Sequence, residues 1–373
     1  MSHPLLEKHR ATLEGALHAI ATRGYWSAYN EMPSPKAYGE TAPDDGKQAF
    51  EAHLGKPFEL GQPGQTAWHG GEESPYGIEL NVTYPVCDID ALIAAGQSAM
   101  TGWQAAGADG RTGICLEILD RLNRQSFELA HTVMLTTGQG WMMAFQAGAP
   151  HAQERGLEAV AYAYREQRFV PHEATWEKPQ GKNPPLVLKK HFEIVGRGVG
   201  VVVGCGTFPT WNTYPGRFAA LATGNAVIVK PHENAILPAA ITVRTIRAVL
   251  AENGIDADLV TLCVPAERET TQKLVTPRRS SRSISLAATS SASGCSTTAA
   301  RHRSMPSWPA STTSSSIRPT PTSACWATSP SRWRCIRARC ARPRPRHHRL
   351  PGQAGSRSCR ARRHPVRRYA PAH

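Results

Sequence analysis

The sequence has 373 residues and a formal net charge of +14, a length that allows two ordinary domains with a core each. All 29 acidic residues precede Pro277, whereas residues 277–373 contain 20 arginines and no lysine, aspartate or glutamate. Residues 1–276 carry 23 basic and 29 acidic residues, a net charge of −6, so the basic charge that suggests polyanion binding belongs to the last quarter alone.

Neither a secretory signal nor a membrane span is predicted. Residues 1–20 have scattered charges and no apolar core, and no later run is long enough to cross a bilayer. We therefore expect a cytoplasmic protein with no membrane partner. The nine cysteines form no CxxC pair, so no metal site is predicted, and thiols such as Cys205, at the end of a buried strand, are expected to serve packing.

The first half of the chain reads mainly as helix. An apolar stripe predicts a helix over residues 5–28, and a stretch rich in Pro, Gly and charge over 32–77 is expected to be an irregular surface excursion. Asp90 is the predicted N-cap of a helix over 91–106. Residues 114–138 have apolar residues at helical spacing, and a further helix is predicted over 156–167.

From residue 186 the pattern changes to alternating strands and helices. Apolar runs over 198–205, 225–231 and 258–264 read as buried strands, and 213–224 and 236–254 read as the helices between them. Such alternation predicts right-handed βαβ units and a doubly wound parallel sheet, in which ligands bind beyond the carboxyl ends of the strands.

Polar residues follow two of these predicted strands. Lys230 ends the second strand and Glu233 comes three residues later, so a cation and a carboxylate could hold ribose hydroxyls or a phosphate; a solvated turn is the alternative. Asn212 lies between the first strand and its helix, where its amide could stabilise an oxyanion or serve as a helix N-cap.

The stretch WNTYPGRFAALATGNAVIVKPHE, residues 211–233, resembles the aldehyde dehydrogenase family over its whole length. It has a Trp-Asn pair, a helix, a Gly-Asn turn, a strand ending in Lys, and Pro-x-Glu. The resemblance extends over residues 1–276. The amino-acid sequences of the insert and of the stretch around the candidate site are similar to those of the phenylacetic acid degradation branch of the family. It implies an aldehyde dehydrogenase-like α/β fold, with a helical N-terminal layer and an incomplete doubly wound parallel sheet.

By this resemblance, Asn212 matches the amide that holds the thiohemiacetal oxyanion, Lys230 and Glu233 match the residues that hold the adenosine ribose, and Trp211 lines the cofactor cleft. The implied cofactor is NADP or NAD. The implied substrate is the ring-opened semialdehyde CoA thioester of phenylacetate catabolism, a small CoA-linked aldehyde, and members of the family are usually homo-oligomers.

The thiolate nucleophile and the general base that this chemistry needs are not visible after Thr276. If each codon is read from one base earlier, residues 285–291 can encode FTGGNEF, which resembles the family's cofactor turn. Residues 303–313 can encode QVYAELAGVNN, which would hold the base, and residues 335–344 can encode LYSGQMCTTP, which resembles the nucleophile loop. The three segments follow one another in the order of the family's motifs. We interpret residues 277–373 as a frameshifted, disordered tail, with the missing Cys in bases shared by the codons of Cys340 and Ala341. The chain as written is expected to be inactive.

Four segments follow from this interpretation: 1–87 with the N-terminal helix and insert, 88–190 helical, 191–276 binding the cofactor, and 277–373 as the tail. The alternative function is non-specific binding of nucleic acid or another polyanion through the tail's 20 arginines. A metal site at His347, His348, Cys340 and Cys359 matches no zinc spacing, and no specific nucleic-acid partner is predicted.

Overall fold

The structure is a computed structural model that describes residues 3–266, 269–275 and 285–288. Its main sheet has four parallel strands in the order β7-β6-β5-β8. These are β5 (Val199–Val203), β6 (Ala226–Lys230), β7 (Val260–Leu262) and β8 (Ser285–Ala288). The first three strands are buried and consist largely of Val, Leu and Ile, as expected of parallel strands covered on both faces.

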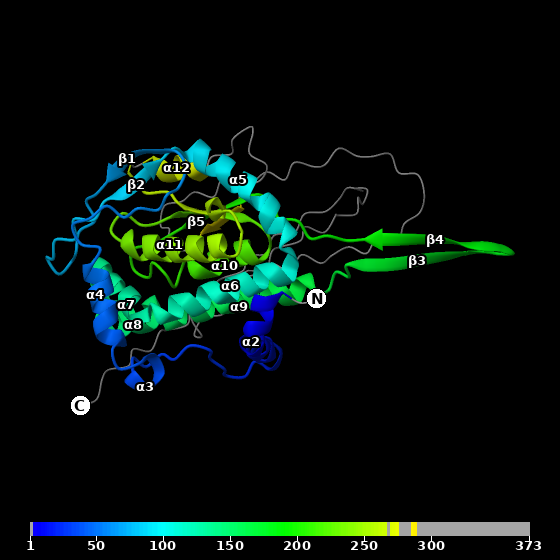
Figure 1. Ribbon diagram of the computed structural model, residues 1–373, viewed down its shortest axis with the longest axis horizontal. Coiled ribbons are helices and arrows are strands. Elements are labelled where there is room, and N and C mark those ends of the chain that lie inside the picture. The colour runs from blue at the N-terminus through cyan, green and yellow to red at the C-terminus, as the bar shows by residue number, and fades with distance from the viewer. Residues whose placement is uncertain (1–2, 267–268, 276–284, 289–373) are drawn as a thin grey trace, which may run out of the picture. The chain divides into compact units, whose positions relative to one another are not determined.

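Helices α10 (Tyr214–Ala222) and α11 (Leu237–Glu252) connect β5 to β6 and β6 to β7. Both crossovers run in the same direction across the sheet, so right-handed connections place both helices on one face. Helix α5 (Ile89–Ala105) covers the other face (Figure 1). A Cβ on Gly96 of this helix would lie 3.3 Å from Ala226 Cβ, so the helix lies close to β6 there. The predicted doubly wound parallel sheet is confirmed.

Strand β8 departs from the prediction. It lies in the segment that the sequence was expected to leave without packed structure, yet it pairs with β5 from Gly200↔Ser285 to Val203↔Ala288. The edge of β5 offers a row of backbone N–H and C=O groups, and these can pair with a strand of almost any sequence. For residues 285–288 the expectation of disorder is therefore wrong, and the rest of the tail lies outside the described residues.

The N-terminal helix is shorter than predicted and divided in two. Helices α1 (Pro4–Lys8) and α2 (Arg10–Thr22) meet at His9. Helix α2 ends because Arg23 adopts the left-handed conformation, with φ 58°, which terminates a helix in the same way as a C-terminal glycine. The predicted continuation to residue 28 is wrong.

The insert over residues 32–77 is not irregular throughout. Helix α4 begins with a proline and two acidic residues in its first turn and buries Phe50, features that favour a helix N-terminus and hold the helix on the core. A short strand of the insert also pairs with a strand after it. The elements are α3 (Pro35–Tyr38), α4 (Ala42–Glu51), β1 (Gln65–His69) and β2 (Tyr84–Cys87).

A layer of helices follows, with α6 and α9 side by side against α10 (Figure 1). Asp88, not Asp90, is the N-cap of α5, since its carboxylate accepts from the backbone N–H of Ala91 at 2.9 Å. The predicted helical region 114–138 breaks at Gln125. The helices of this layer are α6 (Gly107–Arg124), α7 (Ser126–Thr137), α8 (Trp141–Gly148) and α9 (Pro150–Gln167).

Strands β3 (Glu173–Gln180) and β4 (Asn183–His191) form an antiparallel hairpin. Nearly every residue of both strands is exposed, including Leu186, Val187 and Leu188. The strand pattern was predicted from residue 186 onward, which covers the second part of β4. Strand β3 was not predicted, because its residues are mostly polar or charged. In the described part of the chain, no helix is long and apolar enough to span a membrane.

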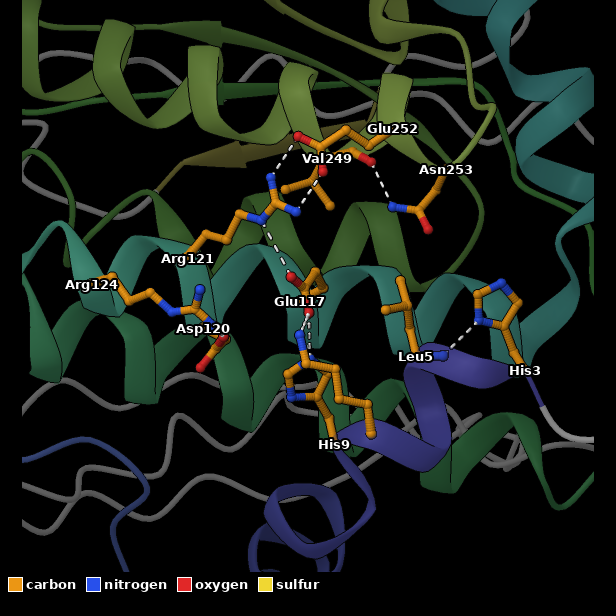
Figure 2. A network of polar contacts seen from close by, with 11 residues as sticks. His3, Leu5, His9, Glu117, Asp120, Arg121, Arg124, Val249, Glu252 and Asn253 are labelled. Carbon is orange, nitrogen blue, oxygen red and sulfur yellow. Dashed lines mark hydrogen bonds and ion pairs between the residues drawn. The ribbon is translucent and has the colours of Figure 1, made fainter.

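Glu117 on α6 connects α1 to α6 and, through Arg121, to the end of α11 (Figure 2). Its buried carboxylate accepts from Lys8 Nζ at 2.6 Å, His9 Nε2 at 2.7 Å and Arg121 Nε at 3.2 Å. Arg121 also pairs with Glu252 at the end of α11. Burial by itself would raise the pKa of Glu117, but the three hydrogen bonds together lower that pKa from 4.5 to about 2.

We expect Glu117→Gln to lower the free energy of unfolding at pH 7 by about 2 kcal/mol, since Lys8 and Arg121 remain partly solvated. The lowered pKa means that the ionised carboxylate stabilises the fold above pH 4.5 and that this stabilisation is lost as the pH falls towards 2. Urea unfolding at pH 3, 5 and 7 measures both effects. Glu14→Gln, at an exposed pair, is the control, and equal acid sensitivity of Glu117→Gln and the unmodified protein would contradict the prediction.

Candidate functional site

The candidate site lies at the carboxyl edge of the parallel sheet. Strands β5 and β6 pair in register and end together at Val203↔Lys230, so the segments after them leave the sheet on the same side. Gly204 donates its N–H to the carbonyl of Lys230 at 2.7 Å. A Cβ on Gly204 would lie only 3.3 Å from Pro231 Cα, so the two segments are in close contact there.

Asn212 lies in the segment between β5 and α10. Its side-chain Nδ2 donates to Cys205 Sγ at 2.9 Å, and its backbone N–H donates to the carbonyl of Phe208 at 3.1 Å. The segment is also tied to α8 through a 2.7 Å hydrogen bond from Thr210 Oγ1 to the carbonyl of Gly148. The N-cap of α10 is Thr213, so the alternative interpretation of Asn212 as a helix cap is wrong.

Cys205 was expected at the end of a buried strand, and this position is wrong by two residues, whereas its expected packing role stays a prediction. Strand β5 ends at Val203, and Cys205 is half-buried in the following segment, against the Asn212 amide. The other three cysteines that the structure describes are buried; burial raises the pKa of Cys115 and of Cys263 to about 12. Only the short separation of Cys205 from Asn212 in sequence could have signalled this contact.

Lys230 is half-buried at the end of β6, and Glu233 is exposed at the tip of the following turn. Burial lowers the pKa of Lys230, while nearby Glu233 and Cys263 act in the opposite direction. An ammonium group and a carboxylate are therefore both present at this edge of the sheet, three residues apart in the sequence. Their chemistry fits a ribose, because the ammonium can donate to a hydroxyl and the carboxylate can accept from a diol.

Trp211 is half-buried beside Asn212, with its ring in contact with α9. The guanidinium carbon of Arg155 lies 5.7 Å from the centre of the Trp211 ring, and the Phe208 ring lies 6.0 Å away. Trp211 therefore anchors the segment that carries Asn212 to the helical layer. Its predicted place in the cofactor cleft stays a prediction.

Within residues 3–266, 269–275 and 285–288, no three or more His, Cys, Asp or Glu side chains are grouped to hold a metal ion. Of the tail motifs that the shifted reading predicts, those over residues 303–313 and 335–344, the latter with Cys340 and Ala341, lie outside the described residues. Only the first four residues of the motif over 285–291 are described, as strand β8.

Comparison with known proteins matches the part of the chain that contains this edge to a family. A model of the aldehyde dehydrogenase family matches residues 83–302, and no curated protein matches the sequence. The crystal structure of an NAD-dependent aldehyde dehydrogenase from Burkholderia multivorans is 58% identical, with a TM-score of 0.72, over 74% of this chain and 50% of that chain. The present chain therefore spans about half the length of that relative.

Two more distant structures share the fold. Proline utilization A from Bdellovibrio bacteriovorus is 17% identical, with a TM-score of 0.53, over 69% of this chain and 26% of its own. A 1-pyrroline-5-carboxylate dehydrogenase from Thermus thermophilus is 18% identical, with a TM-score of 0.50, over 68% of this chain and 47% of its own.

Proposed function

Because the chain belongs to the aldehyde dehydrogenase family, we propose that it is the cofactor-binding part of an NAD-dependent enzyme that oxidises an aldehyde to the acid. The observation that carries the proposal is the carboxyl edge of the sheet. There the Asn212 amide follows one strand, and Lys230 with Glu233 follows the neighbouring strand in register with it.

Asn212 has the role of oxyanion donor in this proposal. A side-chain amide carries two N–H donors, and the contact of Nδ2 with Cys205 Sγ at 2.9 Å orients the group. A donor fixed before the reaction stabilises negative charge that develops on the substrate oxygen, without reorganising at the moment of reaction.

Lys230 and Glu233 would hold the adenosine ribose of the cofactor. NAD, when bound, accepts hydride from the substrate. Lys230 donates to ribose oxygens and Glu233 accepts from the diol. A carboxylate at this position favours a 2′-hydroxyl over a 2′-phosphate, and the 58% identical relative is NAD-dependent, so NAD is the proposed cofactor and NADP the alternative.

The substrate and the assembly rest on resemblance to the phenylacetic acid degradation branch. We propose a CoA-linked semialdehyde as substrate. We also propose a homo-oligomer, which the exposed apolar side chains of the β3–β4 hairpin support, since an exposed hairpin edge is suited to pairing between chains. Analytical ultracentrifugation of the 373-residue protein checks the assembly, and a monomer at all concentrations would contradict it.

Nucleotide binding tests the cofactor proposal directly. Lys230→Met and Glu233→Gln are each expected to raise the Kd for NAD about tenfold, as loss of one charged hydrogen bond would. Titration of the protein with NAD, followed by saturation-transfer NMR, measures this Kd, because the method detects the weak binding expected of a chain that spans about half the length of its relative. Lys47→Met on α4, an exposed lysine, is the matched control. Unchanged Kd values for both site variants would remove the assignment.

A further inference from the structure

Glu72, in the insert before β2, is a buried carboxylate that the proposed mechanism does not use. Its side chain accepts from Tyr84 Oη at 2.5 Å, from the backbone N–H of Ile236 at 2.5 Å and from that of Leu237 at 3.2 Å. The residue is 6% exposed. Burial raises the pKa of Glu72, and these three hydrogen bonds oppose the rise.

The two backbone groups that Glu72 binds have the turn with Glu233 directly before them. Ile236 is the N-cap of α11 and makes no side-chain cap of its own. Ile236 and Leu237 are fully buried, so their N–H groups need a partner inside the protein, and Glu72 supplies it. The turn between Lys230 and Ile236 is closed by a bridge between His232 and Ala235.

The position of Glu233 is therefore determined from two sides. On one side, Lys230 is held by the β-ladder with β5. On the other side, Ile236 is held by Glu72, whose carboxylate is held in turn by Tyr84, a fully buried residue of β2. The turn between these anchors is short, so displacement of Ile236 moves Glu233.

We propose that Glu72 is a positioning residue for the cofactor: it holds the start of α11 so that the turn carrying Glu233 keeps its place beside Lys230. The inference rests on the proposed function of Lys230 and Glu233. By this inference the insert contributes to nucleotide binding through Glu72, although no residue of the insert is proposed to touch the nucleotide.

A matched pair of variants of the 373-residue protein separates positioning from stability. Glu72→Ala removes an acceptor of two backbone N–H groups at the carboxyl edge of the sheet. Asn225→Ala does the same at the amino edge, where Asn225 Oδ1 accepts from the N–H groups of Arg197 at 2.6 Å and Gly198 at 3.1 Å. Both variants are expected to lower Tm to a similar extent.

Only Glu72→Ala is expected to weaken NAD binding, with a Kd about tenfold higher by saturation-transfer NMR, whereas Asn225→Ala stays within about twofold. Glu72→Gln keeps a carbonyl oxygen for Ile236 and Leu237, so it is expected to retain the fold and stay within about threefold of the unmodified Kd. It provides the comparison if Glu72→Ala does not fold.

Three results would overturn the inference, and they are distinguishable. If the unmodified protein binds NAD and Glu72→Ala matches Asn225→Ala in Kd, Glu72 is only a structural cap, and the cofactor site stands. A tenfold loss in Glu72→Gln equal to that of Glu72→Ala would also deny that the backbone contacts carry the effect. If the unmodified protein binds no NAD, the proposed cofactor site and the positioning role fall together.

Discussion

Restoring one base near the codon of Thr276 is expected to yield a longer protein that oxidises a CoA-linked semialdehyde with NAD, while the 373-residue chain produces no NADH above background. The amide of Asn212 and the charges of Lys230 and Glu233 can orient reactants, but none of them can form the covalent bond to the aldehyde carbon that precedes hydride loss. Removal of a nucleophile costs about 10⁴-fold or more in rate.

Spectrophotometric NADH formation by the two proteins measures this difference. The control is the restored protein with the new cysteine, encoded across the codons of Cys340 and Ala341, replaced by serine; it should return to background. Robust turnover by the 373-residue chain would contradict the prediction. In that case Cys205→Ala decides whether the half-buried thiol beside Asn212 acts as nucleophile. Failure of the restored protein on any aldehyde would leave only a shared fold.

The second large effect is expected at Asn212 in the restored protein. Asn212→Ala should lower kcat about 100- to 1,000-fold with little change in KM, because a preorganised donor to an oxyanion acts mainly on the transition state. The loss of the contact with Cys205 removes no core packing, since both residues are half-buried.

Steady-state kinetics of the purified variant measure kcat and KM separately. Asn253→Ala, which removes a side-chain amide bonded to the carbonyl of Val249 at the end of α11, is the matched control and should keep kcat within about twofold. A kcat for Asn212→Ala within tenfold of the unmodified value would refute the oxyanion role.

The order of elements around the site could be predicted because strand and helix periodicity are local properties. The apolar runs of β5, β6 and β7 and the helical spacing of α10 and α11 led to a doubly wound sheet, and the parallel-sheet rule brings Asn212 and Lys230 to one edge. Helix ends were less predictable, as the break at His9 and the cap at Asp88 show, because neighbouring polar residues compete for the same capping role.

The sequence by itself determined the family, the alternation of strands and helices along residues 198–264 and the loss of acidic residues after Thr276. Only the tertiary structure decided which side chains meet at the site. The hydrogen bonds of Glu72 to Ile236 and of Asn212 to Cys205 depend on segments that the chain brings together from other parts of the fold. No local pattern encodes such partners, because a buried carboxylate or backbone N–H is satisfied by whichever group the packing places within about 3 Å of it.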